Sequence, residues 1–341
     1  MSTARPTWKQ TLARHQRSAL RSSAWQLVNS LVPYAILWGL MAWASSRSIW
    51  LMLALAVPAA GFLVRVFIIF HDCGHGSFFR SSRANAFWGF VTGVLTFTPY
   101  GQWRHDHAVH HATAGDLDRR GRGDIWTLTV GEYLEAPLGR RLAYRLARNP
   151  LVLFVVGPLY VFLIKQRFPS RKDGPRERRS VHLMNAMLAA LIVALGLTVG
   201  FGTLVKVQLP LTLLAGAAGV WLFYVQHQFE GVSWERREHW DFVGAALKGS
   251  SFYRLPKVLQ WFSGNIGFHH IHHLAPGIPN YNLEKCHREE PLFQAVKPIT
   301  LWGSLKSLSF RLWDEQRRKL VGFGHVRAVR RERRAALGAG A

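Results

Sequence analysis

The chain has 341 residues, of which 49% are hydrophobic, and a formal net charge of +24 at pH 7. A charge this high can indicate nucleic-acid binding, but here the Lys and Arg residues cluster beside long apolar runs, which favours a membrane protein. We therefore do not expect nucleic acid as a partner. The two cysteines, Cys73 and Cys286, predict neither a disulfide framework nor a cysteine-based metal site.

Four apolar runs occupy residues 25–45, 49–70, 183–205 and 208–226. Each is close to the ~20 residues that cross a bilayer core of ~30 Å. Two shorter runs, 85–99 and 150–164, are more typical of interfacial or re-entrant segments. A cleaved signal peptide is not expected, because the first run continues past the ~7–15 residues of a signal core. We predict an all-α integral membrane protein with four transmembrane helices in two hairpins.

The basic residues predict the orientation. Five of them precede the first run, seven lie in 165–179 and ten follow Leu305, whereas the two short connections hold only Arg47 and Lys206. Because basic segments stay in the cytoplasm, we expect both termini and the middle segment there, in a bacterial cytoplasmic membrane. The predicted division is a basic N-terminal segment (1–24), a membrane domain (25–300) and a basic C-terminal tail (301–341).

Eleven of the 16 histidines gather in four places that this topology puts on one side of the membrane. The stretch "HDCGH" follows the second apolar run, "HDHAVHH" follows the first short run, a single histidine ends the fourth long run, and "HHIHH" lies further on. Their histidines are His71 and His75; His105, His107, His110 and His111; His227; and His269, His270, His272 and His273.

In a helix, residues three and four apart share a face. On that assumption eight histidines converge and two, His105 and His270, point elsewhere; the eight are His71, His75, His107, His110, His111, His269, His272 and His273. Imidazole binds Zn, Cu, Fe and Ni alike, so the ligand type does not identify the metal. Eight nitrogens exceed one coordination sphere, so we predict two metal ions in a cytoplasmic helical cap.

These three boxes resemble those of the membrane fatty acid desaturases, in the same order and with similar intervals. The stretches "HDCGHGSFF" and "HHIHHLAPGIPNYNL" are most similar to the acyl-lipid, delta-12 and omega-3 branch, and the resemblance covers about residues 30–300. It implies two non-haem irons, O2 as co-substrate and a cis double bond placed in the acyl chain of a membrane lipid. No H-P-G-G haem motif occurs. We therefore expect a separate electron donor, a ferredoxin or a cytochrome b5 with its reductase.

We predict His227 as a ninth ligand, because eight histidines divide unevenly between two ions. The resemblance adds that acyl-lipid desaturases carry a similar Gln-His here. Other branches have an Asn one turn earlier, where this chain has Phe223, so no water-mediated amide is expected.

The outer imidazole nitrogens also need oxygen partners. The candidates are Asp72, Asp106 and Asp241, each of which could instead be a helix cap or a surface carboxylate. The acidic residues of the Gly-rich stretch 115–133 fit a solvated loop better than a support for the metal site.

Two alternatives remain at this point. A related His-rich membrane oxygenase would hydroxylate an acyl, alkane or carotenoid substrate instead of desaturating it. A metal transporter would carry ionisable residues within its spans, where this chain has only Arg65.

Overall fold

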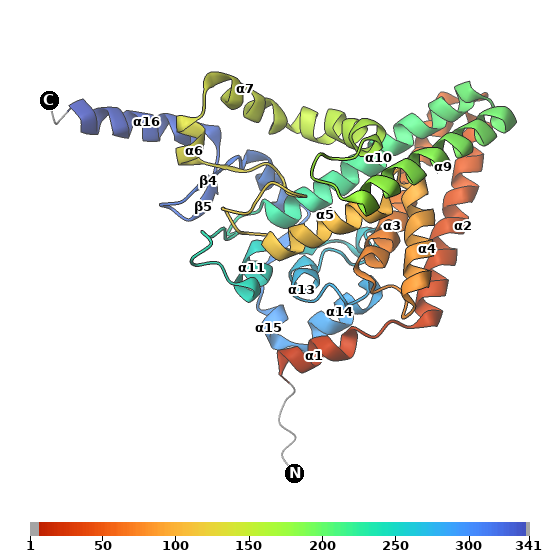
Figure 1. Ribbon diagram of the computed structural model, residues 1–341, viewed down its shortest axis with the longest axis horizontal. Coiled ribbons are helices and arrows are strands. Elements are labelled where there is room, and N and C mark those ends of the chain that lie inside the picture. Colours follow the sequence, from red (N-terminus) through yellow and green to blue (C-terminus); the bar gives the residue numbers. More distant parts are fainter. Residues whose placement is uncertain (1–6, 339–341) are drawn as a thin grey trace, which may run out of the picture.

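The computed structural model describes residues 7–338, and four long helices dominate it (Figure 1). They are α2 (Leu20–Ala44), α3 (Ile49–His75), α9 (Pro175–Val199) and α10 (Phe201–His227), and each is long and apolar enough to cross a membrane. The predicted four-span membrane fold is confirmed. At ~1.5 Å per residue, each helix is longer than the ~30 Å hydrocarbon core, so its polar end can emerge from the lipid.

The helices pair as two hairpins. Ser48 caps the start of α3 by accepting a hydrogen bond from the Leu51 amide at 3.2 Å. Gly200 alone joins α9 to α10, with φ at 87°. The sequence placed this turn at Lys206, which is wrong: Lys206 lies inside α10. Hydropathy could not locate the turn because the apolar residues continue through it, whereas only glycine readily accepts that backbone angle.

Helix α3 lies at the centre of the bundle and packs against α2, α10 and the short helix α4 (Ser82–Leu95). Half of its most apolar stretch is buried, more than in any other span. Arg65, the charge within this helix, donates to the Trp261 carbonyl and lies 3.9 Å from the centre of the Trp261 ring. One nitrogen of the guanidinium and its face are therefore satisfied by the protein, while Nε has no hydrogen-bond partner among the described residues.

The second short apolar run is irregular. It consists of the π-helical turns η1 (Val152–Val156) and η2 (Tyr160–Ile164) around α8 (Gly157–Leu159). Together with α7 (Leu138–Ala147) this run forms a pair of helices bent by 65°, which would make a fifth span if counted as one.

The remaining elements pack around one end of the spans, where α3 and α10 finish. The helices are α1 (Trp8–His15), α5 (Tyr100–Thr113), α6 (Val130–Glu135), η3 (Lys165–Arg167), α11 (Phe242–Gly249), α12 (Lys257–Phe262), α13 (His269–Leu274), α14 (Asn280–Glu289), α15 (Pro291–Gln294), η4 (Gly303–Ser309) and α16 (Phe323–Gly338). The strands are β1 (Leu128–Thr129), β2 (Phe252–Arg254), β3 (Pro298–Thr300), β4 (Leu312–Asp314) and β5 (Lys319–Val321).

The C-terminal segment folds back onto the body before α16 projects from it (Figure 1). Strand β4 pairs in parallel with β1 and antiparallel with β5, while β2 and β3 form a separate parallel pair. Of the predicted basic end segments, residues 1–6 and 339–341 lie outside the described residues.

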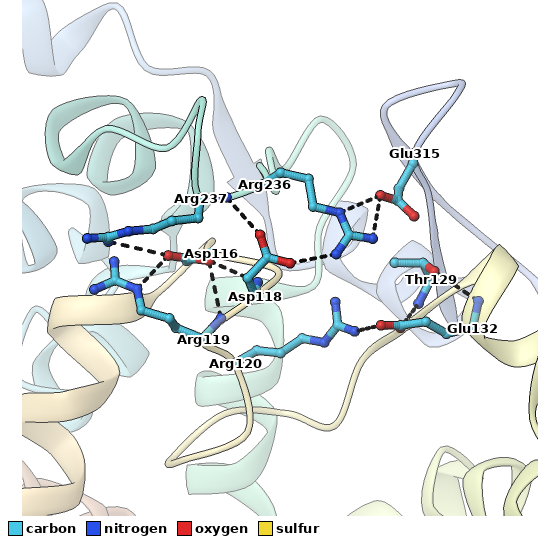
Figure 2. A network of polar contacts seen from close by, with 9 residues as sticks. All are labelled: Asp116, Asp118, Arg119, Arg120, Thr129, Glu132, Arg236, Arg237 and Glu315. Atoms are coloured by element: carbon cyan, nitrogen blue, oxygen red, sulfur yellow. Dashed lines mark hydrogen bonds and ion pairs between the residues drawn. The ribbon is translucent and has the colours of Figure 1, made fainter.

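A polar network fastens the stretch that follows α5 to this C-terminal unit (Figure 2). Asp116 is buried and accepts from Arg119 Nε at 2.6 Å. Asp118 accepts from Arg236 Nη1 at 2.6 Å, and Arg236 Nε reaches Glu315 at 2.8 Å. The Gly-rich stretch predicted as a solvated loop is thus anchored at its beginning.

Candidate metal centre

Each histidine box lies on a helix, which the spacing argument had assumed. The first ends α3, where Gly76 stops the helix in a left-handed conformation with φ at 71°. The second occupies the last two turns of α5, and the third forms α13, a helix of six residues. His227 is the last residue of α10. Four helix segments therefore converge on one site.

The histidines form two adjacent groups. We call the first the five-histidine cluster; its ligand atoms lie within 4.8 Å of one another and belong to His71, His75, His107, His111 and His272. The second, the three-histidine cluster, meets the same criterion with His110, His227 and His273. His269 borders this second group, since its Nε2 lies 3.1 Å from His227 Nε2. The nine predicted histidines are thus brought together.

The second and third boxes each contribute to both clusters. His107 and His111 enter the first cluster whereas His110 enters the second, and His272 and His273 divide in the same way. Neighbouring residues on a helix point about 100° apart, so adjacent histidines belong to different clusters.

The geometry fits bound metal. His111 Nε2 lies 3.2 Å from His107 Nε2 and 3.1 Å from His272 Nε2. Ligands at ~2.0–2.1 Å from one ion are separated by about 3.0–3.4 Å, so these contacts suit a shared ion. The Nε2 atoms of His75 and His273 are buried with no hydrogen-bond partner among the described residues. A metal ion would satisfy them.

The protonation state of the clustered histidines also suits metal binding. Burial, and after it the neighbouring imidazoles, holds the pKa well below the usual 6.5 in His107, His111, His269, His272 and His273. These rings are therefore neutral at physiological pH and keep a free lone pair, which metal binding requires.

Two carboxylates orient the rings from outside. His71 Nδ1 lies 3.1 Å from Asp72 Oδ1, and Asp72 Oδ2 accepts from both the backbone and the side-chain nitrogen of Asn280, at 2.7 and 2.8 Å. His110 Nδ1 lies 2.5 Å from Asp124 Oδ1. In addition, His227 Nδ1 faces the Gly249 carbonyl at 3.3 Å. Such contacts fix the tautomer and the direction of each ring.

The other two predicted carboxylates have different partners. Asp106 accepts from Arg122 Nε at 2.6 Å. Asp241 caps α11 by accepting from the Gly244 amide at 2.7 Å, so the structure corrects its expected place beside an imidazole. Asp124, which does contact a histidine, was not singled out from the Gly-rich loop. Its only signal was a carboxylate shortly after a histidine box.

The two histidines that the sequence set aside lie outside both clusters. His105 is exposed on α5. His270 is fully buried, and its ring packs against Phe252, His287 and Phe293.

A cavity of about 790 Å³ adjoins the clusters. His71, His107 and His269 form part of its wall, and mainly apolar residues of α3, α10 and η2 form much of the rest. The lining includes the charged residues Arg122, Lys165 and Lys172. Along α10 it extends from Gln208 and Thr212, in the first half of the helix, to Gln226 beside His227. This lining, mainly apolar with a few charged residues, suits a long apolar molecule with one charged end.

Fold and site together define an integral membrane protein whose histidine-rich centre can hold two metal ions beside a long cavity. Residues 48–299 match the family model described as fatty acid desaturase. The chain is 50% identical to the fatty acid desaturase of Bacillus subtilis (strain 168), over 91% of this chain and 88% of the relative. The chain belongs to the fatty acid desaturase family and is an oxidoreductase. The predicted family is confirmed.

More distant relatives belong to the same family. The chain is 29% identical to the omega-3 fatty acid desaturase, endoplasmic reticulum, of Vigna radiata var. radiata, over 79% of this chain and 71% of that protein. It is 26% identical to the sn-1 acyl-lipid omega-3 desaturase (ferredoxin) of Nostoc sp. (strain 36), over 78% and 71% respectively. These relatives support the predicted desaturase function and not the alternative of a metal transporter.

Proposed function

We propose that this protein uses O2 and two irons to place a cis double bond in the acyl chain of a membrane lipid. The observation that carries this proposal is the position of both histidine clusters beside one long, mainly apolar cavity. A methylene far from any functional group offers nothing for acid–base catalysis, so a cofactor must perform the difficult step.

The five-histidine cluster would hold one iron, and His110, His227, His269 and His273 would hold the other. Iron bound there supplies the O2-dependent removal of hydrogen from the methylene carbons. The chain's own residues position that chemistry. Asp72 and Asp124 orient His71 and His110, and the apolar walls keep water from the reacting carbons.

The cavity supports a lipid substrate. Its lining includes Lys165 and Lys172, which suit the phosphate of a glycerolipid, and Arg122, which is also paired with Asp106. Its apolar length suits the chain. Acyl-lipid desaturases are among the relatives, which agrees with this choice.

The electron donor is a separate protein, a ferredoxin or a cytochrome b5 with its reductase. Three relatives carry ferredoxin in their names. Such carriers are commonly acidic, and a chain of net charge +24 can attract them electrostatically. We place the clusters and both termini on the cytoplasmic side of a bacterial membrane, because the basic segments flank that end of the spans.

The test is expression in a host that lacks polyunsaturated lipids, followed by mass spectrometry of the acyl chains. We expect a new double bond that depends on O2, and about two irons per purified chain. A hydroxylated product would assign the protein to the related oxygenases instead. An active protein containing stoichiometric zinc and no iron would refute the metal assignment.

A further inference from the structure

We propose that three residues of α10 set the length of the acyl chain that the cavity accepts. Gln208 and Thr212 form the polar end of the cavity, here called the floor, which stops the methyl end of the chain. Gly219 has no side chain and so leaves open the space through which the chain passes. This inference deepens the proposed function and rests on it. It identifies residues that select chain length, which neither the histidine boxes nor the family assignment specify.

The floor is polar although it lies within a span. Gln208 Oε1 accepts from Trp38 Nε1 at 3.3 Å, and Gln208 Nε2 donates to Thr212 Oγ1 at 3.1 Å. Trp38 comes from α2, so two spans close this end together. A methyl group advancing further would have to separate these hydrogen bonds in surroundings that offer no replacement. The cavity wall therefore ends in a side-chain network and not in further apolar lining.

Gly219 lies between this floor and the metal centre. A Cβ atom added there would have no heavy atom within 4 Å, so the space beside it is open cavity. Gly216, one turn nearer the floor, is different because a Cβ there would lie 2.8 Å from Pro158. Phe223, one turn nearer the centre, packs its ring 5.3 Å from that of His110. A chain that reaches the floor from the metal centre must pass Gly219.

The direction of the chain follows from solvation. The charged headgroup stays at the end that carries Arg122 and Lys172, because burying it in the span would cost far more than leaving it near water. The methyl end therefore points toward Thr212. From Gly219 to Thr212 is seven residues, about 10 Å of helix, which is the length of about eight extended carbon atoms. A side chain at Gly219 removes that length from the cavity.

The experiment uses full-length protein and two opposite variants. Gly219→Leu fills the open space, and we expect at least a tenfold fall in unsaturated C16 and C18 chains with the iron content unchanged. Gln208→Ala opens the floor, and the longest chain that is desaturated should increase by two carbons or more. Gly202→Leu is the matched control: it lies on the same helix, is exposed and also has no heavy atom within 4 Å of its Cβ position.

The readout is the unsaturated fraction at each chain length, with iron content and thermal stability measured on every purified variant. If the wild type is active and both Gly219→Leu and Gln208→Ala keep the wild-type chain-length limit, this inference is overturned and the proposed function stands. Equal losses in Gly219→Leu and Gly202→Leu would overturn it as well. A wild type that makes no unsaturated product would refute the proposed function and this inference together.

Discussion

At the scale of single residues, Asp124 shows how much of a metal centre lies outside its ligand motif. Its Oδ1 faces His110 Nδ1 at 2.5 Å, and its Oδ2 accepts from the Gly121 amide at 3.1 Å. The loop thus fixes the orientation of the Asp124 carboxylate, and the carboxylate fixes the orientation of the His110 ring. Asp241, which the sequence analysis named as a candidate partner of an imidazole, caps a helix instead.

We expect Asp124→Ala to lower iron affinity and activity by about 10–100-fold, because His110 loses the partner that sets its tautomer. Metal analysis of the purified protein and a desaturation assay measure both effects. The matched control is Asp241→Ala, which should cost about 1 kcal/mol of stability as a lost helix cap and leave the iron in place. Equal iron loss in the two variants would contradict the assignment of Asp124.

At the scale of elements, the stretch that follows α5 is held to the C-terminal unit by a polar network (Figure 2). Asp116 is fully buried and accepts from the backbone amides of Asp118 and Arg119, at 2.9 and 3.2 Å, as well as from the Arg119 side chain. Its other partner, Arg237, is more than half exposed and lies 3.7 Å away. Asp116 therefore contributes more to the stability of the fold than Arg237 does.

Asp116→Ala should lower the free energy of unfolding by about 2–3 kcal/mol, because it leaves buried donors without an acceptor. Arg237→Ala should cost less than ~1 kcal/mol, since exposed ion pairs are weak. Thermal unfolding in detergent compares the two. A loss in Arg237→Ala as large as that in Asp116→Ala would show that the ion pair, and not the buried hydrogen bonds, holds the loop.

At the scale of the whole molecule, the two hairpins place the histidine ends of α3 and α10 together and the two tight turns at the other end. This arrangement allows a simple labelling experiment, because both native cysteines are buried. Burial also raises the pKa of Cys286 to about 12, so its thiol hardly reacts at neutral pH.

In cells, Arg47→Cys and Gly202→Cys should react with an impermeant maleimide added from outside. His239→Cys should react only after the membrane is permeabilised. His239 is exposed and precedes Trp240, whose Nε1 donates to the Ala114 carbonyl at the end of α5. The physical reason is the distribution of basic residues, which favours the cytoplasm for the end that carries the histidines. Labelling of His239→Cys in intact cells would reverse the proposed orientation.

The sequence by itself determined the four spans and the family. On the assumption of local helix, it also indicated which histidines of each box share a face. These features are local: hydropathy along the chain reports a span, and three- and four-residue spacing reports a helix face. The charge pattern added an orientation that remains a prediction. The position of the turn at Gly200 could not be predicted, because the apolar run has no interruption there.

Only the tertiary structure decided which histidines share a metal position. His110 joins His227 and His273, while its neighbour His111 joins His272, because four helix segments approach one another from different directions. Helix periodicity states which residues share a face, but it cannot state which other helix that face meets. The partnership of Asp124 with His110 and the polar floor at Gln208 depend in the same way on contacts between segments far apart in the chain.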